Sequence, residues 1–180
     1  KGLDFFRDYR NVVLFNFGYP SGEPSCLRAI DGNQIELSGK ENPLIPLVAE
    51  YSRREKIIAD GDEHSLPEEV FGPEPEHQWC YYYEKADLAR QKGDWEEVVK
   101  LGEEVAEKGF APYDRIEWMP FLEAYANLGQ QEKVIELAEM VKPDYVATMN
   151  ICKRFESLEQ MPETYRNSAA FTSIQSALCP

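Results

Sequence analysis

Hydrophobic positions between residues 79 and 142 recur at helical spacing. The first apolar stripe consists of Trp79, Tyr82, Tyr83, Ala86 and Ala89. A second stripe covers residues 95–106, and Gly93-Asp94 lies between the two. Apolar residues three and four positions apart form one face of a helix, and Gly favours a helix end. The pattern therefore predicts two antiparallel helices joined by a tight turn.

The same plan returns further along the chain. Apolar positions over residues 118–125 are followed by a break at Leu128-Gly129 and by another stripe over residues 134–141. The two turn glycines, Gly93 and Gly129, lie 36 residues apart. A fixed period of this length indicates stacked helix pairs. We expect one repeat over about 79–112 and a second over about 113–142.

Beyond the second repeat, the pattern over residues 144–159 and 163–178 predicts a third hairpin whose turn is set by Pro162. This unit, within residues 143–180, is expected to act as the terminal cap that stacked repeats need. The helical-repeat domain then spans residues 79–180.

The first 59 residues have a different character. Residues 12–17 are rich in β-formers, and the runs 26–30 and 34–37 flank Asp31-Gly32-Asn33, a strong hairpin signal. We expect a small sheet of two or three strands, followed by one short helix over residues 47–58. Residues 60–78 contain seven acidic residues, three prolines and no Lys or Arg, which predicts a linker or an extended covering segment.

The formal charge of −14 argues against nucleic acid as a partner, because binding to a phosphate backbone depends on Lys and Arg. A solvated acidic surface accounts for the charge, and a basic partner is the alternative. The longest nearly apolar run, residues 11–17, is too short to cross a bilayer. The chain begins Lys1-Gly2-Leu3 and is expected to be a piece of a longer protein.

Cysteine spacing gives no Cys-x-x-Cys pair and thus no sign of structural zinc. The first interpretation is four buried free thiols. The alternative is one disulfide, most plausibly between Cys152 and Cys179, which would indicate an oxidising compartment. Cys26 and Cys80 are left unassigned.

The stretch Lys92-Gly93-Asp94-Trp95-Glu96-Glu97-Val98-Val99 resembles the turn and second-helix start of a tetratricopeptide repeat. The resemblance implies a mainly α fold of tetratricopeptide-like antiparallel hairpins in a right-handed solenoid, with a small N-terminal β appendage. It also implies a concave face that binds a protein or peptide. The positions of that face are Tyr83, Asp87, Arg90, Gln91, Met119, Glu123 and Asn127. The second repeat departs from the family pattern, since Leu122 stands where a small residue is usual.

A broader resemblance comes from the order of segments. An Arg-rich start, Pro24-Ser25-Cys26-Leu27-Arg28 and the stretch from Trp79 to Asp87 look like the soluble C-terminal tail of bacterial polytopic membrane proteins related to lipid-linked-sugar glycosyltransferases. This implies an accessory domain at the extracytoplasmic face of a bacterial membrane, tethered through upstream spans, with catalytic residues outside the chain.

No nucleophile elbow, phosphate-binding loop or dinucleotide fingerprint is present in the sequence. His64 and His77 lie in the acidic stretch but lack metal-ligand spacing, and the stretch from Asp60 fails the EF-hand pattern. We therefore expect a non-catalytic binding module with no cofactor and no metal.

Arg90 is the most specific candidate on the expected concave face. Its planar fork suits a partner's carboxylate, with Asp87 one turn earlier orienting it. The alternative is a surface ion pair between these two residues, which would contribute little to stability.

Overall fold

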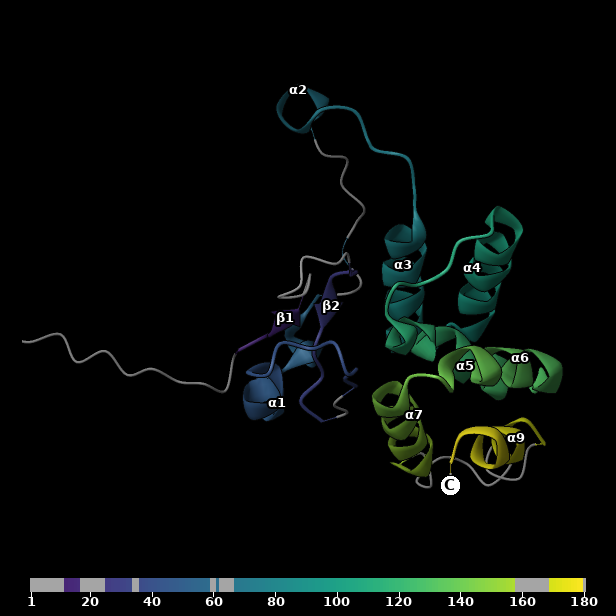
Figure 1. The fold of residues 1–180 in the computed structure, drawn as a ribbon. Helices are drawn as coiled ribbons and strands as arrows, with labels where there is room; N and C mark the ends of the chain where they lie inside the picture. The colour runs from purple at the N-terminus through teal and green to yellow at the C-terminus, as the bar shows by residue number, and fades with distance from the viewer. Residues whose placement is uncertain are drawn as a thin grey trace, which may run out of the picture.

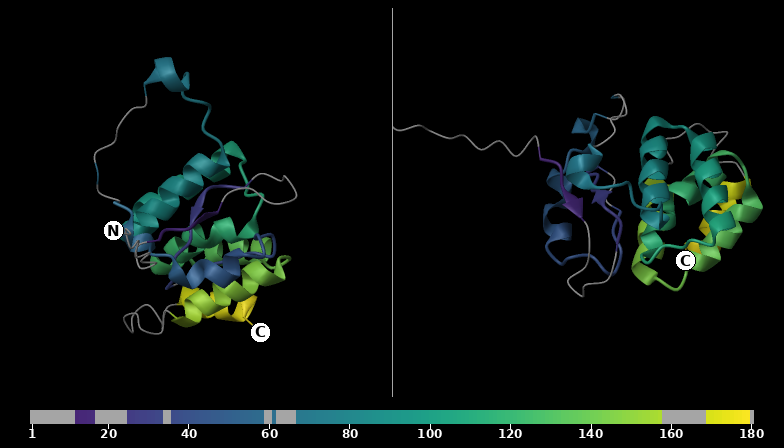
Figure 2. Two further views of the ribbon diagram at one scale, coloured as in Figure 1. Left: turned by 90° about the vertical axis from the view of Figure 1, so that its left-hand side faces the viewer. Right: turned by 90° about the horizontal axis from the view of Figure 1, so that it is seen from above.

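The structure is a computed structural model that describes residues 12–16, 25–33, 36–58, 61, 67–157 and 169–179. It is mainly helical, with a small antiparallel sheet near the N-terminus. Two layers face each other: an N-terminal layer, made of the described residues between 12 and 58, and a helical layer from residue 79 onward (Figures 1 and 2).

The helical layer is built from successive helix pairs. The pairs are α3 (Trp79–Lys92) with α4 (Trp95–Lys108), α5 (Met119–Asn127) with α6 (Gln131–Val141), and α7 (Tyr145–Ser157) with α9 (Ala169–Leu178). A short 3-10 helix, η4 (Arg115–Trp118), leads into α5. The pairs stack one beneath another, with α3, α5 and α7 on the side of the N-terminal layer (Figure 1).

Glycines in the left-handed conformation end the helices at the predicted turns. Gly93 has φ 72° and Gly129 has φ 71°, values that other residues adopt only with strain. After the first turn, the Asp94 carboxylate accepts a hydrogen bond from the Glu97 amide and so caps the start of α4. The predicted pairs over residues 79–142 are thus present.

One hydrophobic core runs through all three helix pairs. Its largest fully buried apolar side chains are Phe121, Phe155, Ile116, Met119, Leu122, Ile151 and Ile174. Gly102 allows α4 and α5 to approach closely, because a Cβ there would lie 2.8 Å from the Tyr125 hydroxyl oxygen. Trp118 is half-buried and packs edge-on against Trp79, with ring centroids 4.8 Å apart. The core forms without the N-terminal layer, from which only Cys26 joins it among the described residues.

The third pair follows the predicted order, with α7 and α9 inside the two expected helical ranges. The turn at Pro162 lies outside the described residues.

Ser52 joins three segments of the N-terminal layer. Strand β1 (Phe15–Asn16) pairs antiparallel with β2 (Arg28–Ala29), and Val12 forms a parallel bridge with Ser52. The buried Ser52 hydroxyl accepts a hydrogen bond from the Leu14 amide at 3.0 Å and donates one to the Ile30 carbonyl at 2.6 Å. A single side chain therefore links the two strands to the segment that follows α1.

The described part of this layer differs from the sequence prediction in two places. β2 pairs with β1, and residues 36 and 37, the described part of the run 34–37, form no strand; residues 34 and 35 lie outside the described residues. Gly32 packs against the backbone of residues 49–52, where a Cβ would lie 2.3 Å from the Ser52 carbonyl oxygen.

The single helix predicted over residues 47–58 is instead three short pieces. They are α1 (Ile45–Val48), η2 (Ala49–Tyr51) and η3 (Arg54–Lys56). Ser52 interrupts the helix with an extended backbone, ψ 137°, in order to meet the strands. The apolar residues that suggested the helix, Leu47, Val48 and Tyr51, are exposed.

Residues 67–76 lie apart from both layers, and His77 stacks on Tyr81 of α3 (Figure 1). They contain the one-turn helix α2 (Glu68–Phe71), and every side chain from residue 67 to 78 is exposed. The predicted linker therefore matches an exposed segment in its described part, while residues 60 and 62–66 lie outside the described residues.

Two disulfides join the four cysteines. Cys152 pairs with Cys179 and ties α7 to the residue after α9, with the two Cα atoms 5.5 Å apart. Cys26 pairs with Cys80 at a Cα separation of 5.0 Å and links the N-terminal layer to α3. The free-thiol interpretation is therefore wrong, and the alternative pairing of Cys152 with Cys179 is present together with a bond that sequence spacing did not suggest.

Candidate functional site

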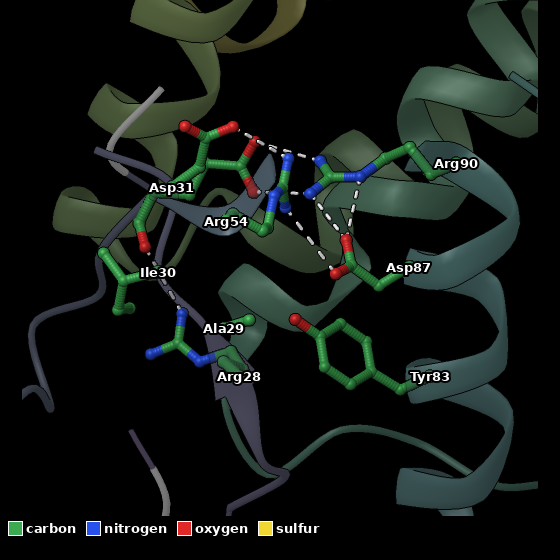
Figure 3. A pocket seen from close by; sticks show the side chains of 9 residues that line it. Arg28, Ala29, Ile30, Asp31, Arg54, Tyr83, Asp87 and Arg90 are labelled. Carbon is green, nitrogen blue, oxygen red and sulfur yellow. Dashed lines mark hydrogen bonds and ion pairs between the residues drawn. The ribbon is translucent and has the colours of Figure 1, made fainter. Parts of the chain in front are cut away.

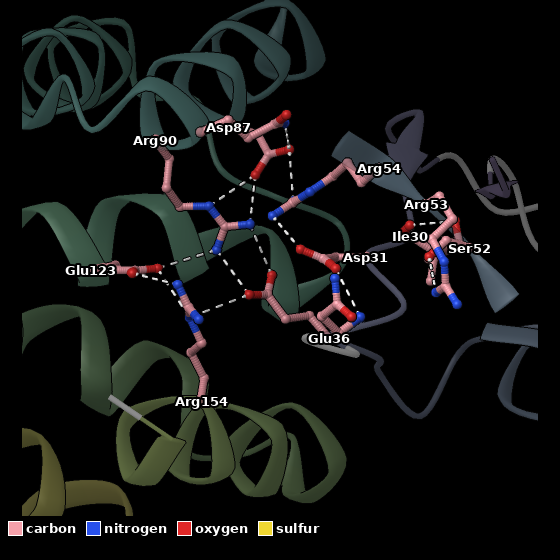
Figure 4. A network of polar contacts seen from close by, with 12 residues as sticks. Ile30, Asp31, Glu36, Ser52, Arg53, Arg54, Asp87, Arg90, Glu123 and Arg154 are labelled. Atoms are coloured by element: carbon pink, nitrogen blue, oxygen red, sulfur yellow. Dashed lines mark hydrogen bonds and ion pairs between the residues drawn. The ribbon is translucent and has the colours of Figure 1, made fainter. Parts of the chain in front are cut away.

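The surface of the helical layer that faces the N-terminal layer is the candidate site. We call it the docking face; its polar members are Asp87, Arg90, Asp114, Glu117, Glu123 and Arg154. The chain that lies on it, residues 25–33 and 36–41, is called the docked segment. Figure 4 shows side chains from both layers converging here.

A closed ring of alternating charges forms the centre of the docking face. Arg90 on α3 donates to both oxygens of Glu36, at 2.9 and 3.0 Å, and its Nη1 lies 3.4 Å from Glu123 on α5. Arg154 on α7 lies 2.7 Å from Glu123 and 3.8 Å from Glu36. Two guanidinium groups and two carboxylates thus alternate, and Glu36 of the docked segment completes the ring (Figure 4).

The ring continues outward through Asp87. This carboxylate lies 2.6 Å from Arg90 Nη2 and 3.6 Å from Nη1 of Arg54 in the N-terminal layer. Arg54 in turn pairs with Asp31 at 3.0 Å. These contacts join η3 to α3 through a chain of paired charges.

Arg28 links separate parts of the docked segment to one another. Its guanidinium pairs with Glu41 and donates to the Glu36 carbonyl oxygen at 3.4 Å, and Asn16 also donates to Glu41. Arg28 and Asn16 are both buried. The position of Glu36 is therefore fixed from the side of the N-terminal layer as well.

Tyr83 closes one wall of a small polar hollow between the layers (Figure 3). The hollow is lined on the other side by Arg28, Asp31 and Arg54. Burial raises the pKa of the Tyr83 hydroxyl well above its usual range, and the negative charge of Asp87 adds to this effect. Tyr83 is therefore a neutral hydroxyl at any physiological pH.

Arg90 stays charged although it is buried. Burial alone lowers its pKa, but the carboxylates of Glu36, Asp87 and Glu123 raise it by more, so the pKa lies well above the ordinary value for Arg. The planar guanidinium group can donate hydrogen bonds in several directions, so one Arg side chain pairs with three carboxylates.

Further along, the docked segment makes two more polar contacts with the helical layer. The Ser38 hydroxyl donates to the Asp114 carboxylate at 2.6 Å, and both residues are buried. Lys40 donates to the Tyr113 carbonyl oxygen at 2.9 Å and its ammonium lies 3.9 Å from the centre of the Tyr113 ring. Both contacts are to residues at or just before the start of η4.

Glu117 anchors the docked segment at its other end, beside the Cys26–Cys80 disulfide. Its fully buried carboxylate accepts hydrogen bonds from the Cys26 amide at 3.1 Å and from the Trp79 indole N–H at 2.7 Å. Burial raises the pKa of Glu117 to about 7, although these two hydrogen bonds act in the opposite direction. Near neutral pH this group therefore exchanges between its two protonation states.

The residues predicted for a concave binding face separate into two sets. Tyr83, Asp87, Arg90 and Glu123 are brought together in the structure and contact or face the N-terminal layer. Met119 is buried in the hydrophobic core. Gln91 is exposed and donates to Asp87, and Asn127 is half-buried and donates to the Glu123 carbonyl oxygen.

Arg90 differs from the surface ion pair considered as its alternative, because the side chain is buried and meets three carboxylates. It does hold a carboxylate in its fork, but that carboxylate is Glu36 of the same chain.

Several residues of the site were not predicted. Glu36, Ser38, Asp114, Glu117 and Arg154 come from segments that are far apart in the sequence and have no shared motif. Arg154 stands beside Lys153 and close to Glu156, so its charge did not mark it as a site residue. These residues become recognisable only once the two layers are placed together.

No family model, curated protein or solved structure matches this chain. The contacts of the docking face are therefore the basis for inferring function.

Replacing Arg90 by Ala should lower the free energy of unfolding by about 3 kcal/mol or more, because the fully buried Glu123 and the half-buried Glu36 would each lose one of their two guanidinium partners. Urea denaturation measures this loss. The control is Lys133→Ala, which removes an exposed pair with Glu136 on α6 and should change stability little. Equal, small effects from both substitutions would contradict the buried ring.

Glu117 should make stability depend on pH. Because its pKa is raised from 4.5 to about 7 in the folded protein, the folded state binds the proton more tightly than the unfolded state. This contribution is fully present below about pH 4.5 and is lost as the pH rises through 7. Between pH 5 and 8 the free energy of unfolding should fall by about 2 to 3 kcal/mol more in the wild type than in Glu117→Gln.

Urea denaturation at several pH values measures the two slopes. Glu107→Gln, an exposed change on α4, is the matched control and should keep the wild-type slope. A Glu117→Gln protein whose stability changes with pH as much as the wild type would rule out this role for Glu117.

Proposed function

We propose that this protein is a non-catalytic helical-repeat module that binds short non-helical polypeptide segments on its docking face. The observation that carries the proposal is that this face already holds such a segment, residues 36–40, through side-chain contacts. The charged groups of the face are directed at one another and at this segment, an arrangement suited to binding rather than to chemistry on a substrate.

The arrangement of the helix pairs supports a tetratricopeptide-like right-handed stack, with α7 and α9 as the terminal unit. In such a stack the first helix of each pair lines the inner surface. Here α3, α5 and α7 contribute Arg90, Glu123 and Arg154 to one ring. A binding surface that runs along the stack needs a residue from each successive helix pair, and this ring provides one from each.

The two disulfides support an oxidising compartment, because such bonds persist mainly outside the cytosol. We infer an extracytoplasmic location. Within the described residues, no helix has the length and hydrophobicity needed to cross a bilayer. The acidic surface continues to disfavour nucleic acid as a partner.

One observation favours a second candidate. The Cys26–Cys80 bond fixes the docked segment covalently, which suits an accessory domain whose docking face stays permanently filled. In that case the protein acts as a structural unit of a larger assembly, such as a membrane-bound glycosyltransferase-like enzyme, and meets it through other surfaces.

The test is whether the docked segment binds without a covalent connection. A specific protease site placed at residues 72–76, where every side chain is exposed, would allow the chain to be cut between the layers. Cys26→Ser and Cys80→Ser remove the remaining bond. After cleavage, the N-terminal fragment should stay with the helical fragment in size-exclusion chromatography at micromolar concentration.

Arg90→Ala in the same cut protein should release the fragment, whereas Lys133→Ala should retain it. A second preparation keeps the cysteines and is reduced after cleavage, so that the serine substitutions are not themselves the cause of a loss. Separation of the two fragments with Arg90 intact, while circular dichroism shows the helical fragment folded, would contradict the binding function and favour the second candidate.

A further inference from the structure

Three polar side chains of residues 36–40 contact the helical layer. Glu36 enters the charged ring, Ser38 reaches Asp114, and Lys40 reaches Tyr113. Leu37 and Gly39, the residues between them, have no polar side-chain group; Leu37 is half-buried, and Gly39 lies beside Val146 of α7. The three polar side-chain contacts are thus two residues apart.

Each of the three positions is matched by a different chemical group. The first position, occupied by Glu36, requires a carboxylate, because both of its oxygens accept hydrogen bonds from the Arg90 guanidinium, at 2.9 and 3.0 Å. A neutral amide of the same shape would accept at one atom only and would lose the charge attraction. The first position is thus specific for an acidic side chain.

The second position requires a small hydrogen-bond donor. Asp114 is fully buried, and one of its oxygens already accepts from the Ile116 amide at 3.3 Å. Its other oxygen accepts from the Ser38 hydroxyl at 2.6 Å. A methyl group in place of that hydroxyl would leave a buried carboxylate oxygen without this partner, which is unfavourable.

The third position suits a cation. The Lys40 ammonium donates to the Tyr113 carbonyl oxygen and lies over the Tyr113 ring, and both groups attract positive charge. The three positions together describe a pattern of acid, hydroxyl and amine on alternate residues.

The contact between the layers is of a kind that a competing peptide can replace. It consists mainly of polar contacts, and Cys26 is the only described residue of the N-terminal layer that joins the core of the helices. Polar contacts of this kind contribute modestly once water competes for them. If residues 36–40 leave the docking face, the Cys26–Cys80 bond still keeps the N-terminal layer attached to α3.

We propose that the docking face recognises the sequence pattern Glu-x-Ser-x-Lys, and that residues 36–40 are an internal occupant that a peptide of the same pattern from another protein displaces. This rests on the proposed binding function and adds its specificity. The partner is thus a protein that carries an accessible acid, hydroxyl and amine on alternate residues. The internal copy keeps the face closed to weaker ligands, because a tethered segment acts at millimolar effective concentration.

The experiment uses a fluorescein-labelled peptide with the sequence of residues 33–42 and a second peptide in which the residue equivalent to Glu36 is Gln. Two full-length receptors with a weakened internal occupant are compared with the wild type. One carries Glu36→Gln, Ser38→Ala and Lys40→Ala; the other carries Glu36→Gln alone. Circular dichroism and thermal melting establish that each receptor is folded before fluorescence anisotropy is measured.

Both weakened receptors should bind the native-sequence peptide at least about tenfold more tightly than the Gln peptide, since a bidentate charged contact is lost in the latter. The wild-type chain should bind the native-sequence peptide at least about tenfold more weakly than the triple variant does. High salt should reduce the preference for the native sequence.

Equal binding of both peptides, or binding of neither, to a folded weakened receptor would overturn the proposed specificity. The cleavage experiment separates this failure from failure of the binding function. If the cut N-terminal fragment stays bound but the peptides are not distinguished, the face binds polypeptide without this pattern. If the fragment also separates, the binding function itself is wrong.

Discussion

The ring formed by Arg90, Glu36, Arg154 and Glu123 is the interaction on which the arrangement of the two layers depends. Charges that are taken out of water must be matched closely, because an uncompensated buried charge is strongly destabilising. Each residue of the ring comes from a different element, so the ring closes only when α3, α5, α7 and the docked segment are all in place. It therefore sets the register in which residues 36–40 lie on the helices.

The helical layer and the N-terminal layer are stabilised in different ways. The helices bury a continuous apolar core that includes Phe121 and Phe155, and among the described residues of the N-terminal layer only Cys26 belongs to it. The N-terminal layer has little apolar contact of its own, and several of its larger apolar residues, such as Leu44 and Leu47, are exposed. It depends instead on the charged ring, on the Ser52 contacts and on the Cys26–Cys80 bond. Such a division suits a stable surface that carries an exchangeable occupant.

The helices could be predicted from the sequence because their signals are local. Apolar spacing and the left-handed turns at Gly93 and Gly129 depend only on neighbours within a few residues. The N-terminal layer could not be predicted in the same way. The pairing of β1 with β2 and the break at Ser52 depend on backbone contacts between distant segments, and these leave no period in the sequence.

The part of the site that lies on the helices was predicted, because helical signals are local, and the part on the N-terminal layer was not. Family positions on the helices drew attention to Tyr83, Asp87, Arg90 and Glu123, which do lie together. Their occupant, Glu36, could not be foreseen, because one acidic residue among 33 carries no mark of its partner. Charge matching across two layers is a property of the folded chain and is hidden from any reading of one segment.

The central claim is that non-covalent contacts with the docking face order the docked segment. Amide hydrogen exchange on the full-length Cys26→Ser, Cys80→Ser protein tests it most directly, because the disulfide then cannot hold the segment. The claim predicts slowed exchange over residues 26–30 and 36–41 when Arg90 is present, and faster exchange there in Arg90→Ala while α5 stays protected. Exchange of these residues at the rate of an unfolded peptide, with α3 and α5 protected and Arg90 intact, would contradict it.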